Sequence, residues 1–170
     1  IVSNFRLPSK IKNRLLKSIL ISVSKLHNNG YAHRDIKPEN ILYISNDKVL
    51  LIDMVMSTYY NDKTYFKGGT KSYAAPELLI EEDITIDDWR KIDIWSLGII
   101  IYILEFGEFP WEQANKCKLY TKYKSSDNKQ YWKNKTNDNL ICRLLYYTLN
   151  TEIKKKKNIN ELLAIHNKYS

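Results

Sequence analysis

The stretch HRDIKPEN, residues 33–40, is followed by two short apolar segments at 41–44 and 48–52. Their lengths, and the polar residues between them, predict two brief strands that pair as a ribbon. The first strand starts directly after HRDIKPEN, and the second ends at Asp53. Because the paired strands bring these two positions to the same end of the ribbon, polar side chains should lie together there. Three are expected there: Asp35, Asn40 and Asp53.

These side chains have the chemistry that transfer of a γ-phosphoryl group requires. The reaction needs a carboxylate near the attacking hydroxyl, a cation on the phosphate and oxygen ligands for Mg²⁺. Asp35 can accept the hydroxyl proton, and Lys37 can contact the transferred phosphate. Asn40 and Asp53 can offer oxygen atoms to a metal ion. Either acid alone would be a solvated surface group or a helix cap, but the spacing of the set predicts a phosphoryl-transfer site.

HRDIKPEN resembles the catalytic loop of eukaryotic protein kinases, H-R-D-L-x-x-x-N, and the Lys two residues after its Asp resembles the Ser/Thr class. GGTKSYAAPELL at 68–79 is similar to the end of a kinase activation segment, including its A-P-E. DIWSLGIIIYILEFGEFPW at 93–111 is similar to the family's buried helix and the turn after it. With Asp53, these ordered motifs give the chain its resemblance to Ser/Thr protein kinases.

The resemblance implies a mainly α fold with a small β element, the carboxyl-terminal lobe of a protein kinase domain, over residues 1–170. It implies ATP and Mg²⁺ as cofactors and a protein substrate with a Ser or Thr acceptor. Asp35, Lys37 and Asn40 would be catalytic; Lys37, Asn40 and Asp53 would bind the nucleotide, the last two through the metal. The resemblance also implies supporting roles for five residues. His33 would pack the loop, Arg34 would meet a phosphate or carboxylate of the activation segment, and Asp93 would fasten the catalytic-loop backbone. Thr70 would approach Asp35 and Lys37, and Glu77 would pair with a downstream Arg.

Three features depart from the family pattern. Val55 replaces the glycine of D-F-G, so a β-branched residue stands where backbone freedom normally lets the segment turn. Lys156 stands where an Arg is expected opposite Glu77, and lysine cannot form a bidentate fork. No G-x-G-x-x-G loop, V-A-I-K lysine or partner Glu precedes the first helix, so an upstream amino-terminal lobe is the expected partner. We expect negligible kinase activity from these 170 residues alone.

A finer resemblance concerns EFPWEQANKCKLYTKYK at 108–124 with Trp132, which is similar to the DNA-damage checkpoint effector kinase. Its aromatic residues can equally be ordinary core residues. From this resemblance we expect activity not to require phosphorylation of the activation segment. That segment contains four hydroxyl residues without a recognisable upstream-kinase context: Ser57, Thr58, Thr64 and Tyr65.

Composition limits the classes of partner. The net charge is +8, and the excess of Lys is sharpest at 154–157. That run lacks a nucleic-acid motif and a stacking platform, so a solvated loop or helix start is expected and nucleic acid is not an expected partner. Cys117 and Cys142 lack metal-ligand spacing, which favours an intracellular protein of the nucleus or cytoplasm. No secretory signal is expected, and the longest apolar run, 95–106, is too short to span a membrane.

Apolar residues recur at helical spacings from Pro8 to Asn29, with Ser9 as the expected cap and Gly30 as the expected terminator. The interval from Asp53 to Glu77 is expected to be a loop. Four further helices are expected, near 91–106, 112–124, 139–149 and 158–168.

Three hypotheses about function stay open at this point. The first is a Ser/Thr protein kinase lobe whose other lobe lies upstream. The second is a pseudokinase-like scaffold or binding module, motivated by Val55, Lys156 and the absent lobe. The third is a basic domain that binds nucleic acid through its lysines, for which affinity should depend on salt.

Overall fold

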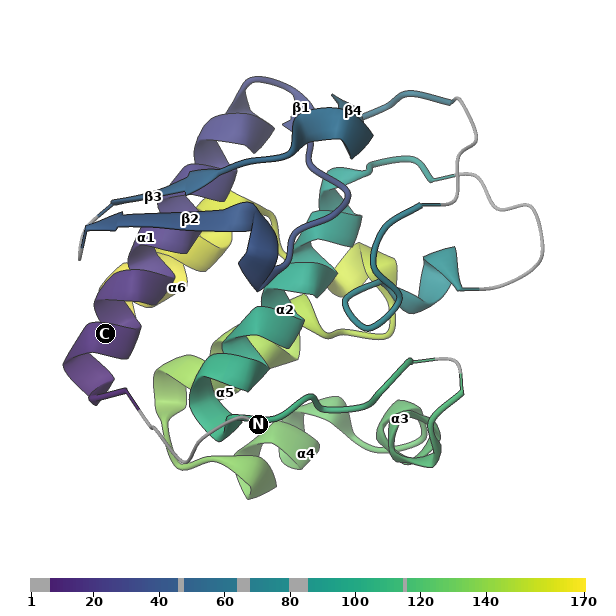
Figure 1. Ribbon diagram of the computed structural model, residues 1–170. Helices are drawn as coiled ribbons and strands as arrows, with labels where there is room; N and C mark the ends of the chain where they lie inside the picture. Colours follow the sequence, from purple (N-terminus) through teal and green to yellow (C-terminus); the bar gives the residue numbers. More distant parts are fainter. Residues whose placement is uncertain (1–6, 46–47, 64–67, 80–85, 115) are drawn as a thin grey trace.

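The computed structural model describes residues 7–45, 48–63, 68–79, 86–114 and 116–170. Within them the chain forms six α-helices and two two-stranded antiparallel sheets (Figure 1). In chain order the elements are α1 (Ser9–Asn28), β1 (Tyr31–Ala32), β2 (Ile41–Ser45), β3 (Lys48–Leu51), β4 (Thr58–Tyr59), α2 (Arg90–Phe106), α3 (Lys118–Lys124), α4 (Asn128–Lys135), α5 (Asn139–Thr148) and α6 (Ile159–Tyr169). Single 3₁₀ turns occupy Pro38–Asn40, Met54–Met56, Pro76–Leu78 and Ile153–Lys155. The expected mainly α fold with a small β element is confirmed.

Helix α1 follows the predicted amphipathic pattern. Leu16, Ile19, Leu20 and Val23 are buried on its inner face. If Ser9 were the cap, the helix would begin at residue 10, but it begins at Ser9 itself. Pro8 is the N-cap, and no side chain caps the helix. The Pro8 carbonyl instead accepts the first helical bonds, so Ser9 lies inside the first turn and the prediction of Ser9 as the cap was wrong.

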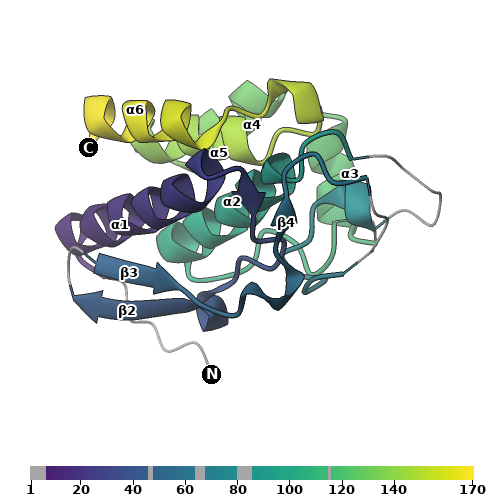
Figure 2. The ribbon, with the colours of Figure 1, turned by 90° about the horizontal axis from the view of Figure 1, so that it is seen from above.

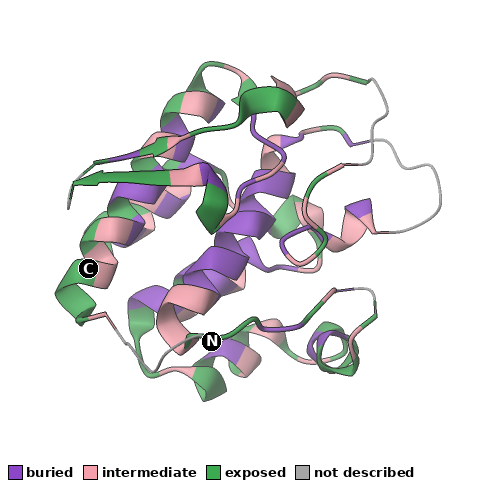
Figure 3. Ribbon diagram, in the orientation of Figure 1, coloured by how far each residue is buried: buried purple, intermediate pink, exposed green. Residues whose placement is uncertain are grey.

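Helix α2 is the centre of the core, and Figure 3 shows it as buried along most of its length. The apolar run at 95–106 is therefore a core helix, as predicted. No helix in the described part of the chain is long and apolar enough to cross a membrane. At Gly98 the helix approaches α5 so closely that an added Cβ would lie 2.6 Å from atoms of both Thr148 and Leu149.

The ribbon of β2 and β3 packs against α1 on the side away from α6 (Figure 2). Val49 is buried, and its carbonyl accepts a hydrogen bond from the Ser22 hydroxyl on α1 at 2.6 Å. The opposite face, which carries Leu42 and its cross-strand partner Leu50, is exposed. The ribbon thus has one buried and one open apolar face. The predicted strands are confirmed, while residues 46–47 of the joining turn lie outside the described residues.

The second sheet was not predicted. Tyr31 of β1 pairs with Tyr59 of β4, and Ala32 pairs with Thr58. The interval after Asp53 is therefore not wholly a loop, because β4 returns it to the strand that leads into HRDIKPEN. Two residues a side are too few for a periodic signal, and the pairing joins distant positions.

The carboxyl-terminal helices correct one prediction. The helix expected near 112–124 starts at Lys118, and α4 was missed. Helix α4 is mostly polar and gives no apolar period, although Asp127 caps it by accepting the Gln130 amide. The helices expected near 91–106, 139–149 and 158–168 are confirmed as α2, α5 and α6.

The aromatic residues between α2 and α4 form part of the core. Tyr123 and Trp132 are fully buried, with ring centroids 5.1 Å apart, and Trp111 stacks on Tyr123 at 5.5 Å. These aromatic rings pack in the core. That role is the alternative that the sequence left open to their being the signature of a subfamily.

Candidate active site

The Asp35 carboxylate lies at the centre of the candidate site. Its Oδ2 accepts the Lys37 ammonium at 2.7 Å. Its Oδ1 accepts both the backbone amide and the hydroxyl of Thr70, each at 2.9 Å. Burial raises the pKa of Asp35, but these hydrogen bonds and the positive charge outweigh it and hold the pKa below its ordinary value. Asp35 is therefore ionised at neutral pH.

Lys37 connects HRDIKPEN to the segment that contains Thr70. Its ammonium contacts Asp35 and also donates to the Thr70 hydroxyl at 2.9 Å. The hydrogen bond to Asp35 raises the pKa of Lys37, and the charges of Asp35, Glu39 and Asp53 act in the same direction. The side chain keeps partial exposure, so the cation is available to an incoming phosphate.

Asn40 is bonded through its backbone to Ile52, the residue before Asp53. The Asn40 carboxamide nitrogen donates to the Asp35 carbonyl at 2.9 Å and to its Oδ2 at 3.3 Å, which leaves the amide oxygen as the atom for a cation. The Asn40 carbonyl accepts the Ile52 amide at 3.0 Å, placing Asp53 one residue beyond that contact. Two such oxygen donors fit Mg²⁺, which usually takes one or two protein ligands and completes its shell with water and phosphate.

No group of three or more His, Cys, Asp or Glu side chains is placed to hold a metal in the part of the chain that the structure describes. A site with one carboxylate and one carboxamide would then depend on the phosphates of a bound nucleotide. Metal binding here is expected to be coupled to nucleotide binding.

The backbone at Asp53 is left-handed, with φ of 60°. Such a conformation costs a non-glycine residue about 1–2 kcal/mol, and it is often found at functional sites. Val55, in contrast, lies in the 3₁₀ turn Met54–Met56, has no positive φ and is 87% exposed. The expected conflict at Val55 is therefore absent, because the turn is made two residues earlier.

Asp93, at the start of α2, accepts hydrogen bonds from the backbone of HRDIKPEN. Its Oδ2 accepts the His33 amide and its Oδ1 accepts the Arg34 amide, both at 2.7 Å. These bonds support Arg34 in a left-handed conformation, with φ of 71°. The His33 ring reaches the Ile52 carbonyl through Nε2 at 3.0 Å, so it ties the loop to the end of β3.

His27 is a site residue that the sequence reasoning missed. It is buried on α1, and its Nε2 lies 2.8 Å from Asp93 Oδ2. Only its position in the last turn of an amphipathic helix, six residues before His33, could have drawn notice. His27 also lines a polar pocket between α1, α2 and α6, with a volume of about 310 Å³.

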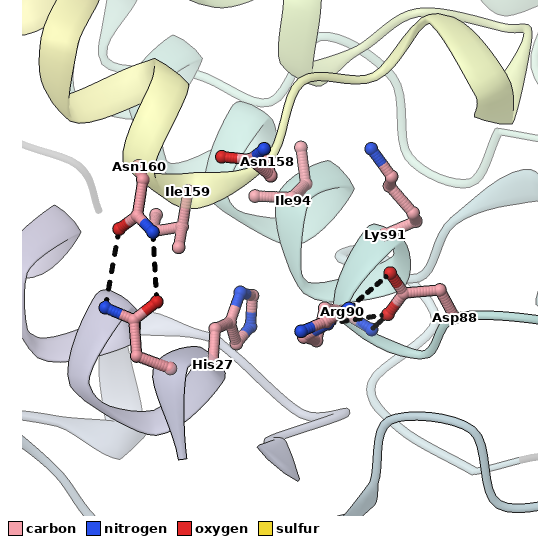
Figure 4. Close-up of a pocket in the computed structure, with 9 residues that line it drawn as sticks. His27, Asp88, Arg90, Lys91, Ile94, Asn158, Ile159 and Asn160 are labelled. Atoms are coloured by element: carbon pink, nitrogen blue, oxygen red, sulfur yellow. Dashed lines mark hydrogen bonds and ion pairs between the residues drawn. The ribbon is translucent and has the colours of Figure 1, made fainter. Parts of the chain in front are cut away.

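Figure 4 shows this pocket, with Asp88 and Arg90 paired and with Asn160 bonded to the amide of Asn28. None of the residues predicted for phosphoryl transfer lines it. One connection of this pocket to the candidate active site is the contact of His27 with Asp93.

Gly69 allows the segment after Asp53 to lie against the catalytic loop. Its φ is 105°, and an added Cβ would meet the Arg34 carbonyl at 2.9 Å. Glycine is required there by both conformation and space, since the next residue, Thr70, must reach Asp35.

Glu77 and Lys156 form the pair that the sequence left in doubt. Lys156 Nζ lies 2.9 Å from Glu77 Oε1 and 5.0 Å from the centre of the Trp95 ring. Glu77 Oε2 is buried and has no hydrogen-bond partner in the part of the chain described. The Lys156 ammonium contacts one oxygen of the carboxylate, whereas an arginine fork could contact both. The expectation that the 154–157 run is solvated was wrong for Lys156, which is 1% exposed because it serves this carboxylate.

The exposed face of the ribbon also belongs to the surroundings of the site and was not singled out from sequence. Leu42, Leu50 and Ile52 are each at least 40% exposed. Their alternation with the buried Val49 was visible as a two-residue period. An apolar surface beside oxygen ligands suits a ligand that has both a flat ring and phosphates.

Comparison with known proteins finds relatives that are described as protein kinases. Residues 1–166 match the family model described as protein kinase domain. A probable serine/threonine-protein kinase KIN1 homolog of Encephalitozoon cuniculi (strain GB-M1) is 35% identical over 131 residues, which cover 76% of this chain and 23% of that protein. The serine/threonine-protein kinase H1 of Homo sapiens is 37% identical over 114 residues, covering 63% of this chain and 26% of that protein. The chain spans about a quarter of the length of the curated relatives that it matches.

Proposed function

The chain belongs to the protein kinase domain family, and on that premise we propose that it is the catalytic-loop lobe of a Ser/Thr protein kinase that transfers the γ-phosphoryl group of ATP. The observation that carries the proposal is the ionised Asp35 carboxylate, bound at 2.7 Å by the Lys37 ammonium and oriented by Thr70. A carboxylate beside a mobile cation is the arrangement that a hydroxyl and a phosphate need when they react.

Asp35 would orient the substrate hydroxyl and take its proton. Because the pKa of Asp35 is held low, the carboxylate is a weak base, and proton transfer should come late, once the oxygen has begun to bond to phosphorus. Lys37 would then shift from Asp35 toward the phosphoryl oxygens and offset their charge.

Asn40 and Asp53 would hold Mg²⁺ through one amide and one carboxylate oxygen. The ion, when bound, would offset the negative charge of the phosphates. We propose that the nucleotide base lies on the exposed apolar face of Leu42 and Ile52, which begins beside these ligands.

The same open face supports the proposal of an upstream amino-terminal lobe as the partner that closes over the nucleotide. Large exposed apolar patches mark interaction surfaces. We further propose protein Ser or Thr residues as the acceptors and an intracellular location, and we keep the checkpoint effector kinase as a subfamily hypothesis. Val55 and Lys156, which motivated the scaffold alternative, are both accommodated without displacing a site residue.

The test is phosphotransfer from Mg-ATP to Ser/Thr peptides by the longest upstream-extended product of the same gene, as wild type and as Asp35→Asn. The variant should lower the turnover rate by at least about 10²-fold, because the hydroxyl loses its proton acceptor. The thermal shift with Mg-ATP should stay, since Asp35 is not a proposed nucleotide ligand. The 170-residue chain alone should show neither activity nor shift.

Asp87→Asn is the matched control, because the Asp87 side chain is 93% exposed and contacts only Lys63 among the described ion pairs. It should leave both the rate and the thermal shift unchanged. A wild-type extended protein with no phosphotransfer and no nucleotide shift would refute the enzyme and favour the scaffold.

A further inference from the structure

The pocket between α1, α2 and α6 has a buried floor and an exposed rim (Figure 4). Three of its lining residues are at most 3% exposed: His27, Ile94 and Ile159. Three others are exposed to solvent: Asn28, Asn158 and Asn160. Its volume of about 310 Å³ is that of about ten water molecules in the liquid, at about 30 Å³ each. The pocket therefore has room for a small molecule that enters beside the asparagines.

Lys91 gives the pocket a positive charge whose hydrogen-bond partner is neutral. Its ammonium donates to the backbone carbonyl of Lys156, so two of its three N–H groups remain for a ligand. Burial lowers the pKa of Lys91, because the charged form has lost part of its hydration. A bound anion would replace that lost stabilisation.

The acids around Lys91 are bound to other cations. Asp88 and Glu161 act on the pKa of Lys91 and oppose the effect of burial. Asp88, however, lies 2.9 Å from Arg90, and Glu161 lies 2.7 Å from Lys157. Lys91 itself forms no ion pair with any residue that the structure describes. Three cations and two acids thus leave one net positive charge on this side of the pocket.

The hydrogen-bonding groups that remain around the pocket are mainly N–H donors. Arg90 uses Nε and Nη2 on the Asp88 carboxylate, which leaves Nη1. Asn158 accepts a backbone amide of its own helix through Oδ1, which leaves Nδ2. The carboxamides of Asn28 and Asn160 are bonded to each other, and each keeps a second N–H. Figure 4 shows these side chains around one space.

The number and direction of the donors indicate the class of ligand. They come from three elements, α1, α2 and α6, so they reach a ligand from three sides. A carboxylate offers two oxygens in one plane, whereas a phosphoryl group offers three oxygens and a charge of about −1.5 to −2 at neutral pH. A compact group with three acceptor oxygens suits this arrangement better than a planar one.

We propose that this pocket is a binding site for the phosphoryl group of a small soluble molecule, either free phosphate or a phosphomonoester. Lys91 supplies the charge, and Arg90 and Asn158 supply further N–H groups to the oxygens. The proposal does not depend on the proposed kinase function, because no residue predicted for phosphoryl transfer lines the pocket.

The test is titration of the isotopically labelled 170-residue chain with inorganic phosphate and, separately, with glycerol 3-phosphate, both without Mg²⁺. The NMR signals of the asparagine side-chain amides report where each probe binds. The signals of Asn28, Asn158 and Asn160 should shift together and saturate. Tighter binding of the ester would assign the rest of the pocket to the alcohol part, and equal affinities would assign the pocket to free phosphate; both results support the proposal.

Lys91→Met removes the charge and its donors, and it should weaken the dissociation constant at least about tenfold, the size of one charge-assisted hydrogen bond. Lys25→Met is the matched control, because Lys25 is an exposed lysine of α1 that does not line the pocket. It should leave the affinity unchanged. Lys37→Ala removes the cation of the candidate active site and should also leave these shifts unchanged.

Asn158→Asp is a second variant that keeps the fold. Aspartate retains the oxygen that caps α6, but it replaces the Nδ2 donor with a negative charge. Binding of both probes should be lost while the melting temperature stays close to that of the wild type.

Binding that survives both Lys91→Met and Asn158→Asp would overturn the proposal, and so would loss of these shifts in Lys37→Ala, which would place the phosphate at the candidate active site. Shifts caused by a phosphoserine peptide but by neither small probe would also overturn it, because the ligand would then be a protein.

The absence of any shift with both probes would show that the pocket holds only water.

Discussion

Lys156 is a buried lysine whose ammonium pairs with one carboxylate. It is 1% exposed, and its ammonium is bound to Glu77. Lys156→Ala should lower the free energy of unfolding by about 3–5 kcal/mol, because the Glu77 carboxylate would stay buried without its cation. Urea denaturation measures this change. Lys155→Ala is the control: its exposed pair with Glu152 should be worth too little to detect, and equal losses in the two variants would contradict the prediction.

Lys156→Arg tests the second oxygen of Glu77. Oε2 has no hydrogen-bond partner in the described part of the chain, and a guanidinium fork can reach both carboxylate oxygens. The substitution should raise the free energy of unfolding by about 1 kcal/mol, again by urea denaturation. A loss of stability would mean that the space beside Trp95 is too tightly packed for the larger head group.

Residue chemistry could be predicted from sequence where the residues that meet are neighbours in the chain, or where the kinase resemblance relates distant ones, as for Thr70 with Asp35 and Asp93 with His33. Asp35, Lys37 and Asn40 lie within six positions, and the structure brings them together. His27 was missed because its partner, Asp93, is 66 residues away and lies on another helix. The left-handed residue Asp53 was not predicted, because the glycine pattern drew attention to the backbone at Val55 instead.

Helix α2 and the carboxyl end of α5 are in close contact at Gly98. Gly98→Ala would gain about 1 kcal/mol of helix propensity, but its Cβ would overlap Leu149 and Thr148 at 2.6 Å. Overpacking of this kind costs about 1–3 kcal/mol, so after the gain in helix propensity we expect a net loss of up to about 2 kcal/mol in thermal or urea unfolding.

A double-mutant cycle separates the clash from other effects of this substitution. Leu149→Ala removes the two Leu149 atoms that the new Cβ would meet and leaves the contact with Thr148 Oγ1. In that background Gly98→Ala should cost less than in the wild type, by more than the roughly 0.5 kcal/mol that independent sites allow. Additive losses would show that the clash is relieved by a shift of the helix.

Helices with a long apolar period and the apolar strands β2 and β3 were predictable, whereas the polar helix α4 and the two-residue strands β1 and β4 were not. Helices α1, α2, α5 and α6 bury continuous stripes, and each was expected within a residue or two of its bounds. Helix α4 buries little besides Trp132, so its sequence gives no period. The β1–β4 pairing is fixed by contacts between distant positions rather than by either strand alone.

For the molecule as a whole, burial of tyrosine phenols should make stability fall steeply in alkali. Burial raises the pKa of Tyr73, Tyr102 and Tyr120 to about 12, from an ordinary value of 10. Between these values the folded protein keeps protons that the unfolded chain has lost. The stability that these groups contribute is therefore fully present below about pH 10 and is lost as the pH rises toward about 12.

The free energy of unfolding, measured in urea at steps from about pH 8 to about pH 12, should decline most above pH 10. Buried Lys156, whose pKa is lowered by burial, acts in the opposite sense only up to about its ordinary value of 10.5, above which the unfolded lysine is also neutral. Tyr102→Phe removes one of the buried phenols and should make the decline shallower. Tyr31→Phe removes a phenol on a residue that is 47% exposed and should leave the slope as it is. Equal slopes in the two variants would show that the core opens before its tyrosines ionise.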